Sequence, residues 1–345
     1  MKKTVLTLVV ALVAAIPALS QGIIFEETTF QQALDKAKST DKLIFVDCYT
    51  AWCGPCKQLA SKVFTRDDVG AIFNAHFINI QVDMEKGEGP ELATRYNVKV
   101  YPTLLVLEPD GAERHRVVGY RQPEALIQSA REALGDNSLA ALRAAHDNGN
   151  RQHALIVNYT RALIDANNTE EAERVADEHF NQLTDEQKTD PDLWPLYTNA
   201  TLSPWGTPRF AYLCQHRQQF DRLVGKQTVD SLMHEITTDL FTTLLKGKNG
   251  YTLASLPAFI DALRDIPFER QPHVIAEARF TLALTAQDAP ATIALYREHG
   301  QNFSTKGITN LIPLMRQKKQ QLEDGTHPAS LQLVQLIETI EQENK

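Results

Sequence analysis

The chain has 345 residues, a formal net charge of −8 at pH 7 and only four cysteines. This acidic balance and the lack of a basic block argue against a surface that holds phosphate backbones, so we expect no nucleic-acid partner. Four cysteines are too few to staple a scaffold of this size with disulfides, so we expect them to serve another purpose. The length exceeds what one hydrophobic core organises, which predicts two domains.

The N-terminal residues 1–20 have the pattern of a secretory signal peptide. Lys2 and Lys3 precede an apolar run over residues 5–16, and small residues around Ala18 precede Gln21. We therefore expect a mature chain from about residue 21 that is periplasmic or otherwise exported. The alternative is an uncleaved anchor. No later segment reaches about 18 consecutive apolar residues, so we expect no stable membrane insertion after cleavage.

Two cysteines follow the first strand of the expected first domain. Residues 42–49 form a nearly continuous apolar run, typical of a central strand covered on both faces. Apolar residues then recur at helical spacing from Cys56 to Phe64. This pattern places Cys53 at the start of a helix and Cys56 one turn inside it.

A thiol at a helix N-terminus is stabilised as the thiolate, with a pKa of roughly 3.5 to 7.5 in such motifs. Cys53 is then the nucleophile, and Cys56 resolves the mixed disulfide. Gly54 and Pro55 fix the short spacer, and Pro55 suits the first helical turn. The alternatives are a static disulfide or a metal site, but zinc needs further ligands and no second cysteine pair exists. We expect no metal and no cofactor.

The rest of the first domain alternates helices and strands. Thr65 is expected to cap a helix, and residues 77–82 read as a strand. The later elements are expected in this order: a helix over 90–96, a strand over 103–107, a turn over 108–111, a strand over 114–118 and a helix over 123–135.

From Ser138 onward the chain reads as one helix after another. Residues 152–166 and 169–183 predict a helical hairpin, and an apolar stripe runs from Val229 to Leu244. Such hairpins resemble tetratricopeptide-type arrays, but no regular 34-residue period is present, so an irregular bundle explains the sequence equally well. The expected domains are residues 21–136 and an all-α domain of helical hairpins over 137–345, whose role is unknown.

Residues 25–135 resemble a thioredoxin-fold domain. The resemblance rests on motifs that keep the family's order: Val46-Asp47, Trp52-Cys53-Gly54-Pro55-Cys56-Lys57, Val82-Asp83, Tyr101-Pro102-Thr103, Asp110-Gly111 and Gly119. Residues 63–69 look closer to the exported branch, such as the periplasmic C-terminal domain of the membrane thiol reductase DsbD. The resemblance implies an α/β thioredoxin fold, a central mixed sheet flanked by helices.

The resemblance also implies roles for single residues. Tyr101-Pro102 would be a cis bond that faces the cysteines and offers the Tyr101 backbone to an extended substrate. Trp52, Gly54, Pro55, Tyr101 and Pro102 would together form the substrate-binding surface, although Trp52 alternatively only packs. Asp47 matches the family's buried acid, which exchanges a proton with the second cysteine because burial raises its pKa. We expect Asn79 beside this acid, where the family usually has a lysine.

Two cysteines lie outside the motif. Cys48 points away from Asp47 in a strand and is expected to be a buried, inert thiol. Cys214 reads as a small core residue of the helical half. The alternative for both is participation in redox chemistry or pairing.

The leading hypothesis for function is an exported thiol-disulfide oxidoreductase that reduces or isomerises disulfides of envelope proteins. Gly-Pro between the cysteines resembles the reducing members, and reduction in an oxidising compartment requires an electron donor, expected to be a membrane thiol reductase. The competing hypothesis is a binding or stress-response protein, in which the helical domain recognises a partner and the thioredoxin-like domain is a docking module.

Overall fold

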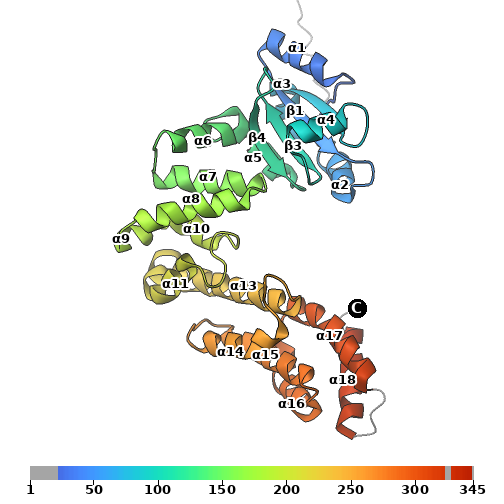
Figure 1. The fold of residues 1–345 in the computed structure, drawn as a ribbon, viewed down its shortest axis with the longest axis vertical. Helices are drawn as coiled ribbons and strands as arrows, with labels where there is room; N and C mark the ends of the chain where they lie inside the picture. Colours follow the sequence, from blue (N-terminus) through green and yellow to red (C-terminus); the bar gives the residue numbers. More distant parts are fainter. Residues whose placement is uncertain (1–21, 323–327, 344–345) are drawn as a thin grey trace, which may run out of the picture. The chain divides into compact units, whose positions relative to one another are not determined.

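The computed structural model describes residues 22–322 and 328–343. The signal peptide expected over residues 1–20 lies outside the described residues. The chain divides into two compact units, with the division between Ala172 and Glu173. Figure 1 shows the sheet in the first unit and the many helices of the second.

The first unit is built on a four-stranded mixed sheet with the order β2-β1-β3-β4. The strands are β1 (Leu43–Tyr49), β2 (Phe77–Asp83), β3 (Thr103–Leu107) and β4 (Glu113–Val118). β1 runs parallel to β2 and antiparallel to β3, and β3 runs antiparallel to β4. The central position predicted for the first strand is confirmed, which explains its continuous apolar run.

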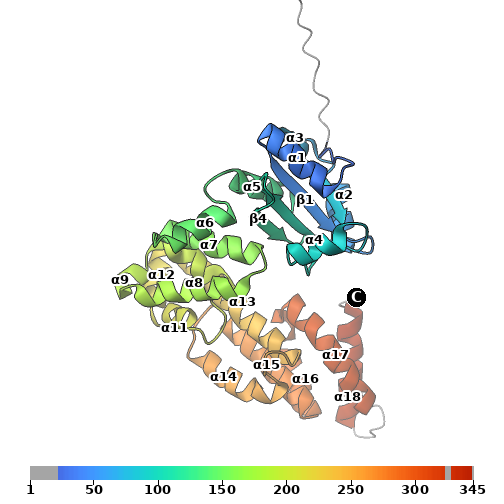
Figure 2. The same ribbon diagram turned by 45° about the horizontal axis from the view of Figure 1, so that its top comes forward.

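Helices cover both faces of this sheet (Figure 2). One face packs against α1 (Phe30–Thr40) and α4 (Gly89–Arg95), and the other against α2 (Gly54–Lys62), α3 (Asp67–His76) and α5 (Pro123–Leu134). Strand residues alternate between faces, so Val46 and Cys48 of β1 point toward α1, whereas Phe45 points toward α2. By the same alternation, Asp47 lies on the α2 face.

The predicted cap of α3 was wrong in one respect. The N-cap residue is Arg66, which makes no side-chain cap, and the Thr65 hydroxyl donates instead to the Ser61 carbonyl at 3.1 Å. A hydroxyl can bond back to a carbonyl four residues earlier as well as forward to a helix start, and sequence spacing alone does not choose between them.

Two further helices cover the exposed edge of β4. α6 (Leu139–Asp147) and α7 (His153–Asp165) pack against this strand, so the first compact unit extends beyond residue 136. The Leu139 N–H donates to Nδ1 of the buried His115 at 3.2 Å. Asp165 pairs with Arg121 at 2.9 Å. Covering an edge strand in this way removes its unpaired backbone groups from further strand addition.

The second unit consists of helices packed in pairs, such as α14 with α15 and α17 with α18. The α-helices from residue 169 onward are α8 (Thr169–Gln182), α9 (Asp185–Lys188), α10 (Trp194–Thr198), α11 (Pro208–Gln215), α12 (Arg217–Phe220), α13 (Lys226–Leu245), α14 (Leu256–Arg264), α15 (Gln271–Thr285), α16 (Ala289–His299), α17 (Thr305–Leu322) and α18 (Pro328–Glu343). Short 3-10 turns lie between them at η1 (Pro191–Leu193), η3 (Leu253–Ser255) and η4 (Gly300–Asn302), and one π turn lies at η2 (Asp221–Gly225).

Sequence patterns explain these helices. The predicted stripe from Val229 to Leu244 is buried along α13 and forms part of the core of the second unit. Several of the prolines that punctuate this half occupy the first turn of a helix, where the missing N–H is not needed: Pro191, Pro195, Pro208, Pro257, Pro272 and Pro290. Among the described helices, none combines the length and the apolar character that crossing a membrane requires.

The contact between His115 and α6 predicts a pH-dependent stability. Burial lowers the pKa of His115, so the folded state binds this proton less readily than the unfolded state. The free energy of unfolding should therefore be retained above about pH 6.5 and fall below it, by at most about 1.4 kcal/mol per pH unit for this one group. Urea unfolding between about pH 7.5 and 5.5 measures this slope.

His115→Asn keeps an acceptor for the Leu139 N–H but does not titrate, so its slope over this range should be shallower. The matched control is His76→Asn, because His76 is exposed on α3 and undergoes the same chemical change outside the contact with α6. An unchanged slope in His115→Asn, or an equal change in the control, would contradict the assignment.

Candidate redox site

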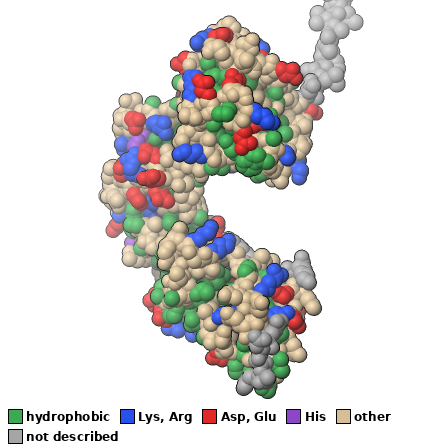
Figure 3. Space-filling model, turned by 45° about the vertical axis from the view of Figure 1, so that its right-hand side comes forward, with side chains coloured by type: hydrophobic (Ala, Val, Ile, Leu, Met, Phe, Trp, Pro, Cys, Tyr) green, Lys and Arg blue, Asp and Glu red, His purple; other side chains and the backbone are tan. Residues whose placement is uncertain are grey.

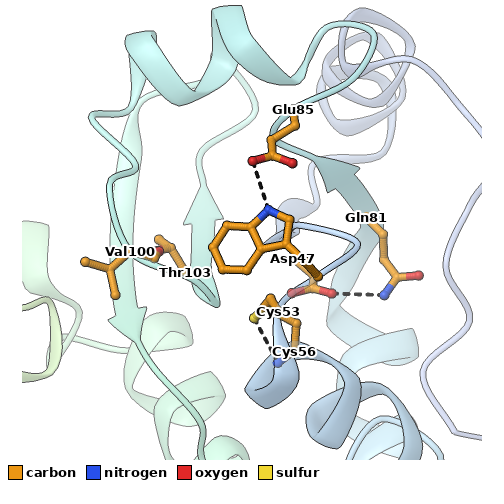
Figure 4. Close-up of a disulfide and its surroundings, with 8 residues drawn as sticks. Asp47, Cys53, Cys56, Gln81, Glu85, Val100 and Thr103 are labelled. Atoms are coloured by element: carbon orange, nitrogen blue, oxygen red, sulfur yellow. Dashed lines mark hydrogen bonds between the residues drawn. A yellow bond between two sulfur atoms is a disulfide. The ribbon is translucent and has the colours of Figure 1, made fainter.

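The cysteines of the predicted motif form a disulfide at the start of α2 (Figure 4). Their Cα atoms are 5.3 Å apart, and Cys53 is the N-cap residue, whose Sγ accepts the backbone N–H of Cys56 at 3.1 Å. The predicted positions, with Cys53 at the helix start and Cys56 one turn inside, are those of the structure. Both residues are buried, at 3% and 5% exposure.

The spacer between the cysteines shapes the surface beside the disulfide. Pro55 lies in the first turn of α2, as expected, where it removes no hydrogen bond. Gly54 has an ordinary backbone conformation, and a Cβ added to it would meet nothing within 4 Å. The fold therefore does not require glycine at this position. Its effect is to leave open space over the first turn, next to Cys53.

Asp47 lies in the middle of β1 and is 2% exposed. Its Oδ2 accepts a hydrogen bond from Nε2 of Gln81 at 2.9 Å, and its Oδ1 has no hydrogen-bond partner among the described residues. Burial raises the pKa of Asp47 to about 7, against the opposing effect of the Gln81 bond. The carboxyl group therefore exchanges protons near neutrality, as its burial led us to expect.

The neighbour of this acid was predicted wrongly. The parallel register places Gln81 opposite Asp47, whereas Asn79 lies opposite Phe45. The Asn79 amide instead donates to Oδ1 of Asn74 at 3.2 Å. The register of two paired strands decides which of their side chains are adjacent. The sequence alone does not give this register, and a register shifted by two residues would place Asn79 beside Asp47 on the same face of the sheet.

Trp52 and Tyr101 form the surface around the disulfide. Trp52 is 66% exposed, and its indole Nε1 donates to Glu85 at 2.9 Å. The ring of Tyr101 meets the indole edge to face, with 6.0 Å between centroids. The Tyr101-Pro102 bond is cis, as the family resemblance implied. The roles of these residues in substrate binding stay predictions.

Glu85 is a site residue that sequence reasoning missed. Its position in the sequence could have indicated that it lies near Cys53, because parallel strands end at the same edge of a sheet. Cys53 follows the end of β1, and Glu85 follows the end of its parallel neighbour β2. The hydrogen bond from Trp52 to Glu85 thereby restrains the indole ring at an exposed position, where few packing contacts hold it.

The remaining two cysteines lie in other environments. Cys48 is buried on the opposite face of β1, and burial raises the pKa of its thiol. Cys214 in α11 is partly buried, and desolvation raises the pKa of its thiol to about 11. Both thiols are protonated near neutrality, which disfavours nucleophilic chemistry. Their inert roles agree with these environments but stay predictions.

A disulfide at the first turn of a helix, after the central strand of a mixed sheet and above a buried carboxyl group, defines a thioredoxin-like redox domain. A family model described as "Thioredoxin-like domain" matches residues 30–134. The chain also resembles a thioredoxin H-type of Oryza sativa subsp. indica, with 32% identity over 112 residues that cover 31% of this chain and 84% of the plant protein. Through this domain the chain belongs to the thioredoxin family.

Two further relatives match over less of their own length. Thioredoxin-2 of Pyricularia oryzae is 38% identical over 104 residues, which cover 30% of this chain and 56% of the fungal protein. The thiol:disulfide interchange protein DsbD of Pseudomonas fluorescens is 33% identical over 101 residues, 28% of this chain and 17% of DsbD. The chain thus spans about half of the first of these relatives and about a sixth of the second. The expected likeness to DsbD is confirmed.

Solved structures resemble the same third of the chain. A candidate disulphide-isomerase from Bacteroides thetaiotaomicron is 45% identical, with 34% of this chain and 97% of that one covered and a TM-score of 0.31. The oxidised C-terminal domain of DsbD from Neisseria meningitidis is 22% identical, with 32% and 98% covered and a TM-score of 0.28. The relatives and the cysteine pair together support thiol-disulfide oxidoreductase activity.

The hydrogen bond from Gln81 predicts how the pKa of Asp47 responds to substitution. Gln81→Leu removes the donor and should raise this pKa further, whereas Gln81→Lys adds a positive charge and should lower it. The pH dependence of the ¹³C shift of the Asp47 carboxyl carbon, in the oxidised protein, measures both changes.

Gln58→Leu is the matched control, because Gln58 is exposed on α2 and undergoes the same chemical change away from Asp47. The control should leave the titration as it is. Shifts in the same direction for Gln81→Leu and Gln81→Lys would show that the Gln81 contact does not set the proton affinity of Asp47.

Proposed function

We propose that the protein is an exported thiol-disulfide oxidoreductase that reduces, or isomerises, disulfides of envelope proteins through a Cys53-Cys56 dithiol/disulfide cycle. The observation that carries the proposal is the bond from the Cys56 N–H to Cys53 Sγ at the first turn of α2. Backbone donors at a helix N-terminus favour the thiolate over the thiol, so Cys53 is the attacking sulfur.

The reaction balances within the two cysteines and the client. The Cys53 thiolate attacks one sulfur of a client disulfide, forming a mixed disulfide and releasing the first client thiolate. Cys56 then loses its proton and attacks Cys53 Sγ, which releases the second client thiolate and forms the Cys53–Cys56 disulfide. Two electrons pass to the client, whose thiolates take up protons from solvent. The Cys53–Cys56 disulfide of the structure corresponds to the oxidised form in this proposed cycle.

Asp47 is proposed to accept the proton of Cys56 in the second step. Figure 4 shows the Asp47 carboxylate close to the disulfide in this view, with Gln81 on its far side. A pKa of about 7 suits a group that takes a proton and returns it to solvent at neutral pH. Oδ1 is the free oxygen for this transfer, because Oδ2 is engaged by Gln81.

The proposal has three further parts: the export of the protein, the direction of the redox reaction and the source of its electrons. Export is supported by the residue pattern over 1–20. The Gly-Pro spacer favours reduction, which needs a reductant to restore the dithiol, and we propose a membrane thiol reductase as that donor. The likeness to a thiol:disulfide interchange protein supports a role in such a thiol-exchange system. The helical unit is proposed to hold or select clients.

A second candidate is a binding or stress-response protein in which the thioredoxin-like domain only docks. The exposed Trp52, held by Glu85, favours this alternative as well as catalysis, because a fixed aromatic surface suits either. The difference lies in the thiols, which a docking module does not need.

Reduction of insulin disulfides by the full chain separates the two candidates. Cys53→Ser should lower the rate by roughly three orders of magnitude, because no other group replaces the attacking sulfur. Cys214→Ser is the matched control, since it removes one thiol outside the site and should leave the rate unchanged. Equal and negligible rates for wild type and Cys53→Ser would defeat the enzyme proposal.

Trapping tests the order of the two sulfurs. Cys56→Ser leaves the attack intact but blocks resolution, so mixed disulfides between Cys53 and clients should accumulate. The adducts are detected on non-reducing gels and dissolved by dithiothreitol. Cys53→Ser in the same background should form none, and adducts that depend on Cys56 instead would reverse the assignment.

A further inference from the structure

A polar cavity lies beside the redox site, within the first compact unit. Its volume is about 410 Å³. One wall comes from the thioredoxin-like domain and the other from α6 and the end of α7. The lining includes the side chains of Lys99, Val100, Thr103, Arg116, Arg143 and Asn167.

The lining has a positive excess, with three basic side chains against one acidic side chain. Arg116 is neutralised by Glu113, since its Nη2 lies 2.6 Å from Oε2 and its Nε donates to Oε1 at 3.0 Å. Lys99 forms no ion pair within residues 22–322 and 328–343. Arg143 donates to the Tyr159 hydroxyl at 3.4 Å, and among the same residues it has no ion pair, although Glu113 and Glu171 act on its charge.

The cavity also has groups that suit a polypeptide. The side-chain amides of Asn97, Asn167 and Asn168 line it and form no hydrogen bonds with other described residues, so they can pair with a peptide backbone. Val100 is 44% exposed and offers an apolar contact in the same wall. A small inorganic anion such as sulfate has no N–H to donate to the amide oxygens and gains nothing from the apolar contact.

The cavity is continuous with the segment that borders the disulfide. Val100 and Thr103 flank Tyr101-Pro102, and the Thr103 hydroxyl donates to the Val100 carbonyl at 2.7 Å, which fixes this segment. The Tyr101 ring in turn meets Trp52, the neighbour of Cys53. Figure 4 shows Val100 and Thr103 on the opposite side of the site from Gln81. A polypeptide that lay along Tyr101 would therefore reach Val100, which lines the cavity.

We propose that this cavity binds acidic residues of the client polypeptide next to the cysteine that Cys53 attacks, with Lys99 and Arg143 as the selecting charges. The inference rests on the proposed function and names the class of client. The whole chain is acidic, and Figure 3 shows positive and negative side chains interspersed over the visible face rather than a basic field. The positive cavity is thus a local feature, and a local charge confers selectivity.

The second wall lies outside the domain that the family model matches. That match ends at residue 134, whereas Leu139, Arg143 and residues 166–168 complete the cavity. The selectivity is therefore supplied by the helices that cover β4, not by the thioredoxin-like domain alone. α6 places Arg143, and the His115 bond to Leu139 holds the start of α6 on the sheet.

The test measures binding of fluorescent peptides to the full oxidised chain by anisotropy. The peptides carry serine in place of the client cysteine and differ only in flanking Asp or Asn residues. Wild type should bind the Asp peptide about tenfold more tightly than the Asn peptide at low salt, and the difference should shrink as salt rises. Lys99→Gln with Arg143→Gln should abolish the preference.

The matched control, Lys62→Gln with Arg131→Gln, removes the same charge from exposed positions outside the cavity and should keep the preference. Equal affinity for the two peptides in wild type, or a preference that survives the double cavity variant, would overturn the proposal. Displacement of the Asp peptide by millimolar phosphate, under conditions where sodium chloride of the same ionic strength leaves the peptide bound, would also overturn it, in favour of a small anion.

Because the peptides contain no cysteine, binding does not depend on thiol exchange. The same peptides with a cysteine disulfide then measure reduction. Preserved binding without any reduction would contradict the redox proposal and leave the cavity proposal standing. Reduction at the same rate for Asp and Asn peptides, together with equal affinities, would contradict the cavity proposal alone.

Discussion

The hydrogen bond from the Cys56 amide to Cys53 Sγ is the interaction on which the site depends. It exists because β1 ends at Tyr49 and α2 begins at Gly54, so that one sulfur caps the helix and the other lies within its first turn. The free N–H groups of a helix N-terminus are therefore directed at Cys53 Sγ, the sulfur that we propose attacks the client. Without this junction, two cysteines three residues apart are only a loop disulfide.

The carboxyl group of Asp47 complements this arrangement from within the sheet. Desolvation raises its pKa, and a single amide donor, Gln81, opposes that shift. A neutral donor stabilises the carboxylate less than a positive charge at the same place does, so the proton affinity stays near neutrality. The second strand of the sheet thus influences the proton affinity of a carboxyl group on the first.

The helices after the thioredoxin-like domain change the surface of the domain beside the Tyr101-Pro102 segment. α6 and α7 cover the edge of β4 and are tied to it by His115, while Arg121 pairs with Asp165. In covering the edge they also close a polar cavity beside the Tyr101-Pro102 segment. One packing arrangement thereby covers an exposed strand edge and adds a charged surface that includes Val100 and Thr103, the residues flanking Tyr101-Pro102.

The sequence by itself determined the elements and the reactive pair, because apolar periodicity, prolines and cysteine spacing are local properties: the central strand, the helix start at Cys53 and the helices of the second unit all follow from them. Only the tertiary structure decided which side chains meet across elements. It placed Gln81 rather than Asn79 beside Asp47, Glu85 on Trp52, and Arg143 opposite Lys99 in one cavity. Strand register and helix docking bring together residues far apart in the chain, and no local pattern encodes those pairings.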